Sequence, residues 1–454
     1  MAIGPEQKRQ VLTAVALGSF SAPFMVSALI VSLPAIGLEF SSDAAGISWL
    51  GTIFFLVAGV CLIPCGRLAD ILGVRRLFSI GVGIYLFAAM ISALAPSAWM
   101  LMAGRAVAGL GAAMVFGTSL AFISLVFPEN ERGRAIGINI ASLTAGFSFG
   151  SVFGGFITFY LSWRLIFVPV MMVAALTLFV LRRRVTVECA LADTRTIDRA
   201  GIGFYVPAVL LLLLGASFIP SPIAIGMLVV GGLLLAGFVI LEEKSTSPML
   251  DPRLFSRPGF LGAVAAALLF YTGTFAPSFL LSLYLQVARD LDPRSAGLVL
   301  VINPVAMALF SPLAGRLVDR RSARSVASVG AVLSILGLLP LFVLNEATPL
   351  LFVIVVLLLL GAGVALFATP VVKRVIGAVE REAYAVASST VETMRLVGMT
   401  LSMACTTVAF TLLLNNRTIA GIGSGDLIGV IHGLSLLYLV LVIGALVLLR
   451  VSTD

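Results

Sequence analysis

The sequence predicts an all-α integral membrane protein with about fourteen membrane-spanning helices, and two observations support this. Its 454 residues are 60% hydrophobic and only 11% charged, whereas charged residues make up about a quarter of an ordinary soluble domain. The apolar residues also form uninterrupted blocks of roughly 18 to 30 residues, the length that a helix needs to cross a hydrocarbon core of about 30 Å. Helices are expected rather than open strands, because lipid offers no partners for unpaired backbone groups.

The apolar blocks, read between charged residues and Pro or Gly breaks, divide the chain into six, two and six spans. The first domain, residues 1–184, has predicted spans near Val11–Leu33, Ile47–Leu68, Leu77–Leu94, Ala98–Phe127, Ala135–Phe159 and Trp163–Leu181. Residues 185–258 contain Ala200–Ile219 and Ile223–Leu241, which a short Pro-Ser-Pro turn joins. The last domain, residues 259–454, has predicted spans near Gly259–Val287, Ser295–Val318, Val326–Leu344, Leu350–Val371, Ala383–Leu414 and Leu427–Leu449.

The middle pair of spans is interpreted as an inserted two-helix hairpin with cytoplasmic linkers. Neither of its spans carries a charged residue, and the turn between them is short. We therefore expect the hairpin to lie at the periphery and not to line a central cavity.

The basic residues predict the orientation of the chain in the membrane. If the N-terminus is cytoplasmic, twenty-three of the 29 lysines and arginines fall in inner loops and only four in outer loops. This asymmetry is the positive-inside pattern, and it requires an even number of spans. The sequence thus predicts a multi-pass protein of the cell membrane with both termini in the cytoplasm.

Other classes of function lack support in the sequence. The net charge of +8 is dispersed between apolar blocks rather than gathered into a basic face, so nucleic acid is not expected as a partner. The four cysteines give neither a disulfide framework nor metal-ligand spacing. The chain has no HExxH, nucleophile-elbow or Walker motif. We expect no enzyme activity, no metal and no cofactor.

Two loops have similar sequences that share the pattern Gly-Arg-Leu-x-Asp, which indicates an internal repeat. GRLADILGVRR runs from Gly66 to Arg76 after the second predicted span, and GRLVDRRSAR runs from Gly315 to Arg324 after the tenth. Two halves that begin alike predict two six-helix bundles related by a pseudo-two-fold axis along the membrane normal, with a substrate site between them near the midplane.

With this repeat, nearly the whole chain resembles the major facilitator superfamily and, within it, the fourteen-span drug:proton antiporter branch. The resemblance implies that the repeated loops form a cytoplasmic latch that closes in the outward-facing state. Asp70 would accept hydrogen bonds from loop arginines or from a helix N-terminus of the opposite half. The candidate latch residues are Gly66, Arg67, Asp70, Gly73, Arg75, Arg76, Gly315, Arg316 and Asp319.

Two further motifs are similar to this branch. RAVAGLGAAM, in the fourth span, begins with Arg105, which lies roughly 10 Å deep and either faces a cavity or extends its charge toward the membrane surface. AGFSFGSVFGG, in the fifth span, has a smooth face for close helix contact, although Ser151 occupies a position where the family usually has proline. The glycines of this helix-packing motif are Gly146, Gly150, Gly154 and Gly155.

The first span departs from the family pattern. Met25 occupies the position where the branch usually has an aspartate for cation recognition or proton coupling. Glu392, in the thirteenth span, is then the one acidic residue well inside a predicted span, and Arg395 follows at i+3, within pairing distance. Glu392 is either a proton site or half of a structural ion pair.

The sequence therefore predicts a secondary transporter that works by alternating access. The leading hypothesis is proton-coupled export of hydrophobic or amphipathic small molecules, with the proton gradient as energy source. The alternative is a facilitator or an exporter of anionic or lipid-like substrates, in which Arg105 and Arg395 recognise negative charge and no first-span carboxylate takes part. The expected partners are a small-molecule substrate, protons and the lipid bilayer, and the chain is expected to be a monomer.

Overall fold

The computed structural model describes residues 4–185, 199–244, 252–379, 384–414, 417–418 and 421–451. Within these ranges, 14 helical segments are long and apolar enough to cross a membrane. The predicted number of spans and their order along the chain are therefore confirmed.

The helices fall into two bundles and a hairpin. The first bundle consists of α1 (Pro5–Glu39), α2 (Ala44–Leu72), α3 (Val74–Ala93), α4 (Ala98–Val126), α5 (Glu129–Tyr160), η1 (Trp163–Ile166) and α6 (Phe167–Arg183). The hairpin consists of α7 (Arg199–Ser217) and α8 (Pro222–Lys244). The second bundle consists of η2 (Pro252–Ser256), α9 (Pro258–Thr274), α10 (Ala276–Leu283), η3 (Tyr284–Ala288), α11 (Pro293–Leu300), α12 (Ile302–Arg320), α13 (Ala323–Leu338), η4 (Leu339–Val343), α14 (Leu350–Gly377), α15 (Tyr384–Leu414) and α16 (Ser424–Val451).

Several helices are longer than the predicted spans. For example, α1 runs from Pro5 to Glu39, well past both ends of the predicted Val11–Leu33. Hydropathy marks the part of a helix that lies in hydrocarbon, but the backbone hydrogen bonds continue into the polar boundary. A helix ends where its terminal groups find other partners, as at Asp43, whose side chain accepts a hydrogen bond from the Gly46 N–H at the start of α2.

Two spans that the sequence predicts as continuous are interrupted. The ninth consists of α9, α10 and the π-helical turn η3, and the tenth consists of α11 and α12. Pro277 lies in the first turn of α10 and Pro304 in the first turn of α12. A proline lacks the N–H that would bond to the preceding turn, so each helix restarts there.

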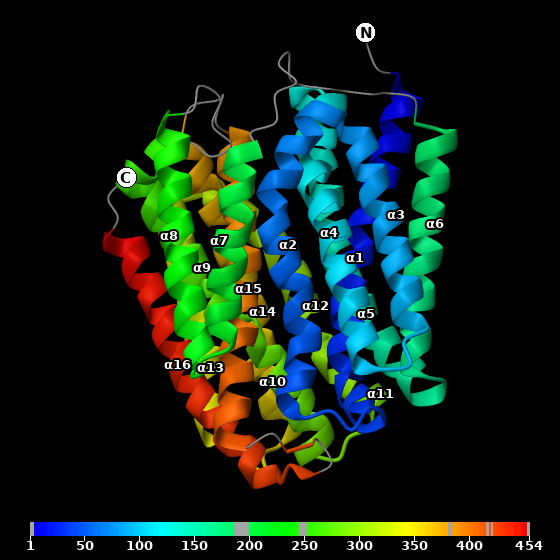
Figure 1. Cartoon of the computed structure of the whole chain (residues 1–454), viewed down its shortest axis with the longest axis vertical. Coiled ribbons are helices and arrows are strands. Elements are labelled where there is room, and N and C mark those ends of the chain that lie inside the picture. Colours follow the sequence, from blue (N-terminus) through cyan, green and yellow to red (C-terminus); the bar gives the residue numbers. More distant parts are fainter. Residues whose placement is uncertain are drawn as a thin grey trace.

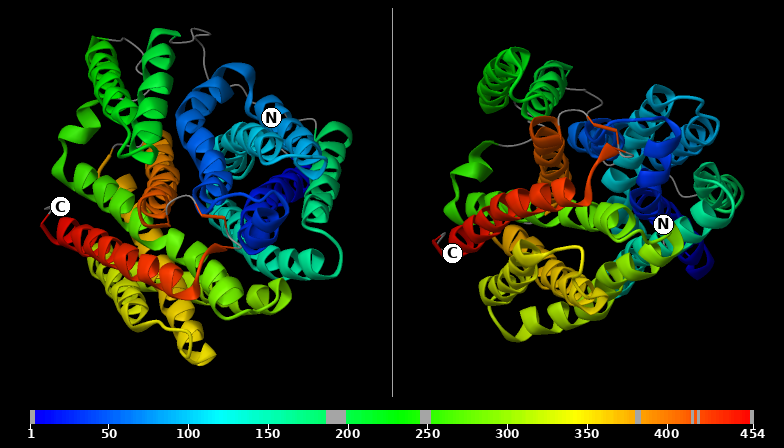
Figure 2. Two further views of the ribbon diagram at one scale, coloured as in Figure 1. Left: turned by 60° about the horizontal axis from the view of Figure 1, so that its bottom comes forward. Right: turned by 90° about the horizontal axis from the view of Figure 1, so that it is seen from below.

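The two bundles stand side by side, and α1 begins and α16 ends at the same side of the molecule (Figure 1). We call this side, where α1 begins and α16 ends, the terminal face, and the other side the opposite face. Figure 2 shows the first bundle and the second bundle as separate groups of helices, with the hairpin alongside both.

Within the first bundle, α5 packs closely against α1 through its glycines. A Cβ at Gly146 would lie 2.5 Å from the Phe20 carbonyl oxygen, and a Cβ at Gly150 would overlap the Phe24 carbonyl oxygen. A Cβ at Gly154 would lie 2.5 Å from the Cα of Ala28. Three successive turns of α5 therefore lie directly against the backbone of α1, which only glycine allows.

The hairpin is less peripheral than its sequence predicts. Although α8 lies mostly in the open, Leu213 of α7 is buried against Leu56 and Val60 of α2, and Val397 and Leu401 of α15 pack against the same cluster. Because α2 belongs to the first bundle and α15 to the second, α7 covers the junction between them. The sequence could not show this, since an apolar helix face packs equally well on lipid or on protein.

We predict that Gly150→Ala lowers stability by about 1 to 3 kcal/mol, because the added methyl group forces α1 and α5 apart. Gly137→Ala is the matched control on the same helix, since a Cβ there meets no atom within 4 Å. Thermal unfolding in detergent should show a lower midpoint for Gly150→Ala only. Equal midpoints for the two variants would refute close packing at Gly150.

Candidate functional site

The candidate site is the junction between the two bundles, and on the opposite face this junction is tightly closed. The backbone N–H of Ala44 in α2 donates to the carbonyl oxygen of Arg417, just after α15, at 3.3 Å. One turn deeper, Thr407 of α15 donates to the hydroxyl of Ser48 in α2 at 2.8 Å, and Ser48 donates to the carbonyl oxygen of Met403 at 3.3 Å. The ends of α2 and α15 at the opposite face are thus joined by hydrogen bonds.

A second closed contact joins α5 to α11 on the same face. A Cβ at Gly155 would overlap the carbonyl oxygen of Pro293, and a Cβ at Gly297 would overlap that of Ser151. Nearby, the guanidinium of Arg294 donates to the hydroxyl of Tyr160 and lies 5.7 Å from the centre of the Phe156 ring. The last glycine of the predicted packing motif therefore contacts the other bundle rather than α1.

A third contact involves the irregular end of the ninth span. The hydroxyl of Ser282 in α10 donates to the carbonyl oxygen of Ile30 at 3.0 Å, and the amide of Gln286 in η3 donates to that of Val31 at 3.0 Å. Both acceptors are in α1, where the downstream Pro34 removes the N–H that would otherwise bond to Ile30. Sequence reasoning missed these residues, although polar side chains in a predicted span were the available signal.

Near the middle of the membrane the junction becomes apolar. The ring of Phe55 in α2 meets that of Phe275, between α9 and α10, at 4.7 Å between centroids. A Cβ at Gly59 of α2 would lie 3.5 Å from the Cβ of Leu396 in α15. About two turns closer to the terminal face, a Cβ at Gly66 would meet no atom within 4 Å. The two bundles are therefore in contact from the opposite face to the middle of the membrane.

The predicted latch residues lie at the terminal face, where the first glycine of each repeated loop leaves an open helix surface. A Cβ at Gly315 meets nothing within 4 Å, as at Gly66. Gly73 has φ +92°, so only glycine fits comfortably between α2 and α3. The guanidinium of Arg75 donates to the Leu181 carbonyl oxygen at the end of α6. Arg67 is half-buried, Arg76 and Arg316 are exposed, and the side chains of Asp70 and Asp319 lie outside the described part of the chain.

Glu392 and Arg395 form the ion pair that their spacing predicts. The Nε of Arg395 donates to a carboxylate oxygen of Glu392 at 3.0 Å, and the side chains are 20% and 35% exposed, respectively. Glu392 lies roughly 12 Å along α15 from Tyr384. It also lies three helical turns from Met403, on the face of α15 that packs against Gly51 of α2. The carboxylate therefore points toward the junction, on the side of the midplane where the bundles diverge.

Arg105 is buried inside the first bundle and does not reach the membrane surface. It is 1% exposed, and its guanidinium lies 4.6 Å from the centre of the Phe54 ring in α2. Its Nε donates to the Leu50 carbonyl oxygen at 3.5 Å. Among the described residues it forms no ion pair, and its Nη1, like the hydroxyl of Tyr85 nearby, has no hydrogen-bond partner. Met25 is also buried, in the apolar cluster that runs through both bundles.

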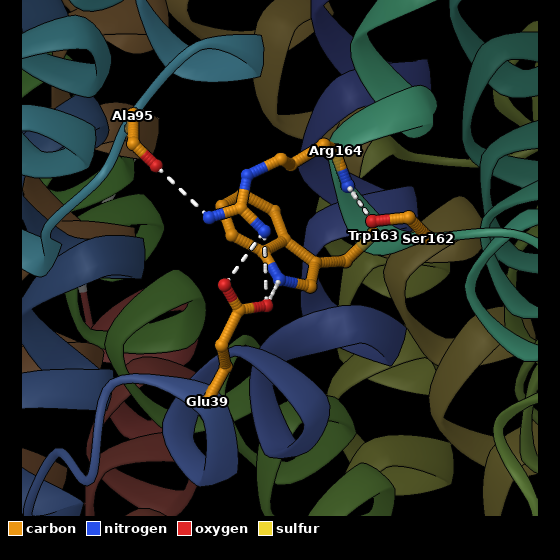
Figure 3. Close-up of polar contacts among 5 residues, drawn as sticks. All are labelled: Glu39, Ala95, Ser162, Trp163 and Arg164. Atoms are coloured by element: carbon orange, nitrogen blue, oxygen red, sulfur yellow. Dashed lines mark hydrogen bonds and ion pairs between the residues drawn. The ribbon is translucent and has the colours of Figure 1, made fainter.

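A polar cluster fastens the rim of the first bundle at the opposite face (Figure 3). The carboxylate of Glu39 accepts a hydrogen bond from the indole N–H of Trp163 at 2.6 Å and pairs with Arg164 at 2.7 Å. Arg164 also donates to the Ala95 carbonyl oxygen at 3.1 Å and stacks on the Trp163 ring at 4.4 Å. The end of α1, the residues just after α3 and η1, which precedes α6, are thereby held together.

Comparison with known proteins places this architecture among membrane transporters. The profile of the Major Facilitator Superfamily matches residues 15–270 and 263–452. The multidrug resistance protein Stp of Mycobacterium tuberculosis is 34% identical over 405 residues, which cover 87% of this chain and 75% of that protein. The riboflavin transporter RibZ of Clostridioides difficile is 27% identical over 368 residues, 80% of each chain. A POT family transporter crystallised with a thioalcohol-conjugated peptide superposes with a TM-score of 0.74 at 15% identity, covering 98% of this chain and 96% of that one.

The fold and the two-bundle junction define a multi-pass membrane transporter, not an enzyme. The chain belongs to the major facilitator superfamily. The fourteen apolar helices in the described ranges fit the fourteen-span branch that the sequence resembles.

We predict that Gly155→Val opens the junction on the opposite face, because the side chain must displace the Pro293 backbone of the other bundle. The readout is the rate at which an impermeant maleimide labels Ser48→Cys in a cysteine-free background. The rate should rise severalfold in Gly155→Val and stay unchanged in the control Gly137→Val, whose site is open. An unchanged rate in both would show that Gly155 does not hold the bundles together.

Proposed function

We propose that the chain exports hydrophobic or amphipathic small molecules in exchange for protons, by alternating access between its two bundles. The pair Glu392–Arg395 is the observation that carries this proposal, because it places a titratable group in the membrane on the face of α15 that looks into the junction. The relative named as a multidrug resistance protein supports the class of substrate.

The coupling step follows from the environment of Glu392. Burial favours the neutral form of a carboxyl group, whereas a paired guanidinium favours the charged form. In the present state the pair is intact and partly exposed. When the bundles close at the terminal face, the pair loses water, and a proton can then take the place of Arg395 as the partner of the carboxylate. Such a group is charged in one state and neutral in the other, which is what coupling requires.

We also infer the direction of transport. Lysines and arginines gather at the terminal face, so we place that face in the cytoplasm. The contacts at the opposite face then make this the inward-facing state, in which substrate enters from the cytoplasm or the inner leaflet. In the outward-facing state, the open glycine surfaces at Gly66 and Gly315 meet the other bundle, and Asp70 accepts hydrogen bonds there.

A second candidate function is favoured by a separate observation. Arg105 is a buried cation without an ion-pair partner among the described residues, and the coupling aspartate expected in the first span is replaced by Met25. A facilitator or an exporter of anionic or lipid-like substrates would use Arg105 and Arg395 to recognise negative charge. The riboflavin transporter among the relatives shows that related chains are not limited to drugs.

We predict that Glu392→Gln abolishes transport driven by a pH gradient in proteoliposomes, because the amide cannot exchange a proton. Substrate binding and downhill exchange should survive. The assay measures accumulation of fluorescent cationic, neutral and anionic dyes with and without the gradient. Accumulation with unchanged pH dependence in Glu392→Gln would make the pair structural.

A second variant controls for misfolding of Glu392→Gln in the proteoliposome assay. Removing one partner of an ion pair in the membrane leaves the other charge uncompensated, which is destabilising, whereas replacing both partners removes both charges. The double variant Glu392→Gln with Arg395→Met should therefore fold even if the single variant does not. It should also lack pH-driven accumulation, and retained accumulation would contradict the coupling role.

Variants of Arg105 distinguish the two candidate functions. If it recognises anions, Arg105→Lys should keep part of the transport of anionic dyes and Arg105→Gln should lose it, whereas cationic dyes should be affected equally by both. Initial rates against dye concentration give the comparison. Thermal stability is the control, and it should not fall in Arg105→Gln, because removing an unpaired buried charge relieves its desolvation cost.

A further inference from the structure

A groove on the second bundle, away from the junction, has the features of a lipid-binding site. It lies at the terminal face between α13 and the last turns of α16 and has a volume of about 350 Å³. Figure 1 shows these two helices together at one edge of the molecule, and they pack against each other. Its lining residues are Arg324, Ser325, Ser328, Val329, Val332, Leu333 and Arg450.

The end of the groove nearest the terminal face is cationic. Arg324 is the second residue of α13, and Arg450 is the last but one of α16, so both lie where the helices leave the hydrocarbon. The side chain of Arg450 is exposed. The N-terminus of α13 adds partial positive charge, although the side chain of Ser322 already accepts a hydrogen bond from the Ser325 N–H and contacts the Ser325 hydroxyl. Two guanidinium groups beside a helix N-terminus form a suitable binding site for a phosphate.

The deeper end of the groove is apolar. Val329 and Val332 are 52% and 38% exposed, and Leu333 is half-buried beside them. Val332 lies eight residues after Arg324, about 12 Å further along the helix and into the hydrocarbon. An occupant that matches both ends must carry negative charge at the membrane surface and an extended apolar chain below it.

We propose that this groove binds an anionic phospholipid of the leaflet at the terminal face. Its phosphate lies between Arg324 and Arg450, and an acyl chain runs along Val329 and Val332. A zwitterionic lipid would bring its own ammonium group to the arginines, and a soluble phosphate would leave the apolar end unused. The bound lipid would join the ends of α13 and α16, and this role does not depend on the substrate or on the coupling ion.

The test is lipid binding to the purified, delipidated full chain, measured by native mass spectrometry. The probes are phosphatidylglycerol and phosphatidylcholine with identical acyl chains. The wild type should bind phosphatidylglycerol more tightly, and Arg324→Gln with Arg450→Gln should weaken that binding by about 30-fold. The control is Arg182→Gln with Arg183→Gln, which removes two exposed charges at the same face from α6 of the first bundle. It should leave the tight site intact.

A second variant separates the lipid from a free anion and does not rely on the arginines. Val332→Trp fills the apolar end at a partly exposed position and keeps both charges, so it should weaken phosphatidylglycerol binding severalfold. Excess inorganic phosphate should not displace the lipid.

Four results would overturn the proposal: equal affinity for the two lipids, equal loss in the control pair, unchanged binding in Val332→Trp, or displacement by inorganic phosphate. A protein mass corresponding to two chains, with the groove covered, would instead make this face an interface between copies.

Discussion

The close approach of helix backbones at glycine is the interaction on which the rest of this structure depends. In lipid, apolar side chains gain little by leaving one apolar environment for another, so helices associate through packing at short range. The chain uses this contact in two ways. Gly146, Gly150 and Gly154 bind α5 to α1 within one bundle, whereas Gly155 and Gly297 bring α5 against α11 across the junction. The first contact holds two helices of one bundle together, and the second joins the two bundles, whose buried apolar residues form one continuous cluster.

A second constraint on the structure is that charged side chains are disfavoured inside the membrane. Most arginines and lysines lie at helix ends, where several neutralise the carbonyl groups of a neighbouring helix, as Arg374 does at Leu449 and Lys373 at Val318. Glu392, Arg395 and Arg105 are the charges that remain deep in the membrane among the described residues. A charge buried in the membrane is destabilising, and such charges in membrane proteins usually have a function. The pair on α15 and the isolated cation in the first bundle are therefore the natural places to look for coupling and recognition.

Much of this could be derived from the sequence because the membrane makes hydropathy decisive. The number of spans, the repeat at Gly66 and Gly315 and the pairing of Glu392 with Arg395 all follow from local patterns. The contacts of Ser282 and Gln286 with α1 could not be derived, since they join residues about 250 positions apart. The burial of Arg105 was also open, because the same sequence allows an arginine to turn inward or to extend to the surface. Met25 is a local signal of a departure from the pattern that the resemblance implies, and its side chain is buried among apolar residues.

The place of α7 has a consequence for how the two bundles can move. Its contacts with α2 and α15 include apolar side chains such as Leu213 against Leu56. If the bundles rotate relative to each other, apolar side chains can shift at small energetic cost, because their contacts are not directional. Hydrogen bonds in the same place would have to break. In the alternating-access cycle proposed above, α7 would let α2 and α15 change their angle and would keep acyl chains out of the gap that this change opens.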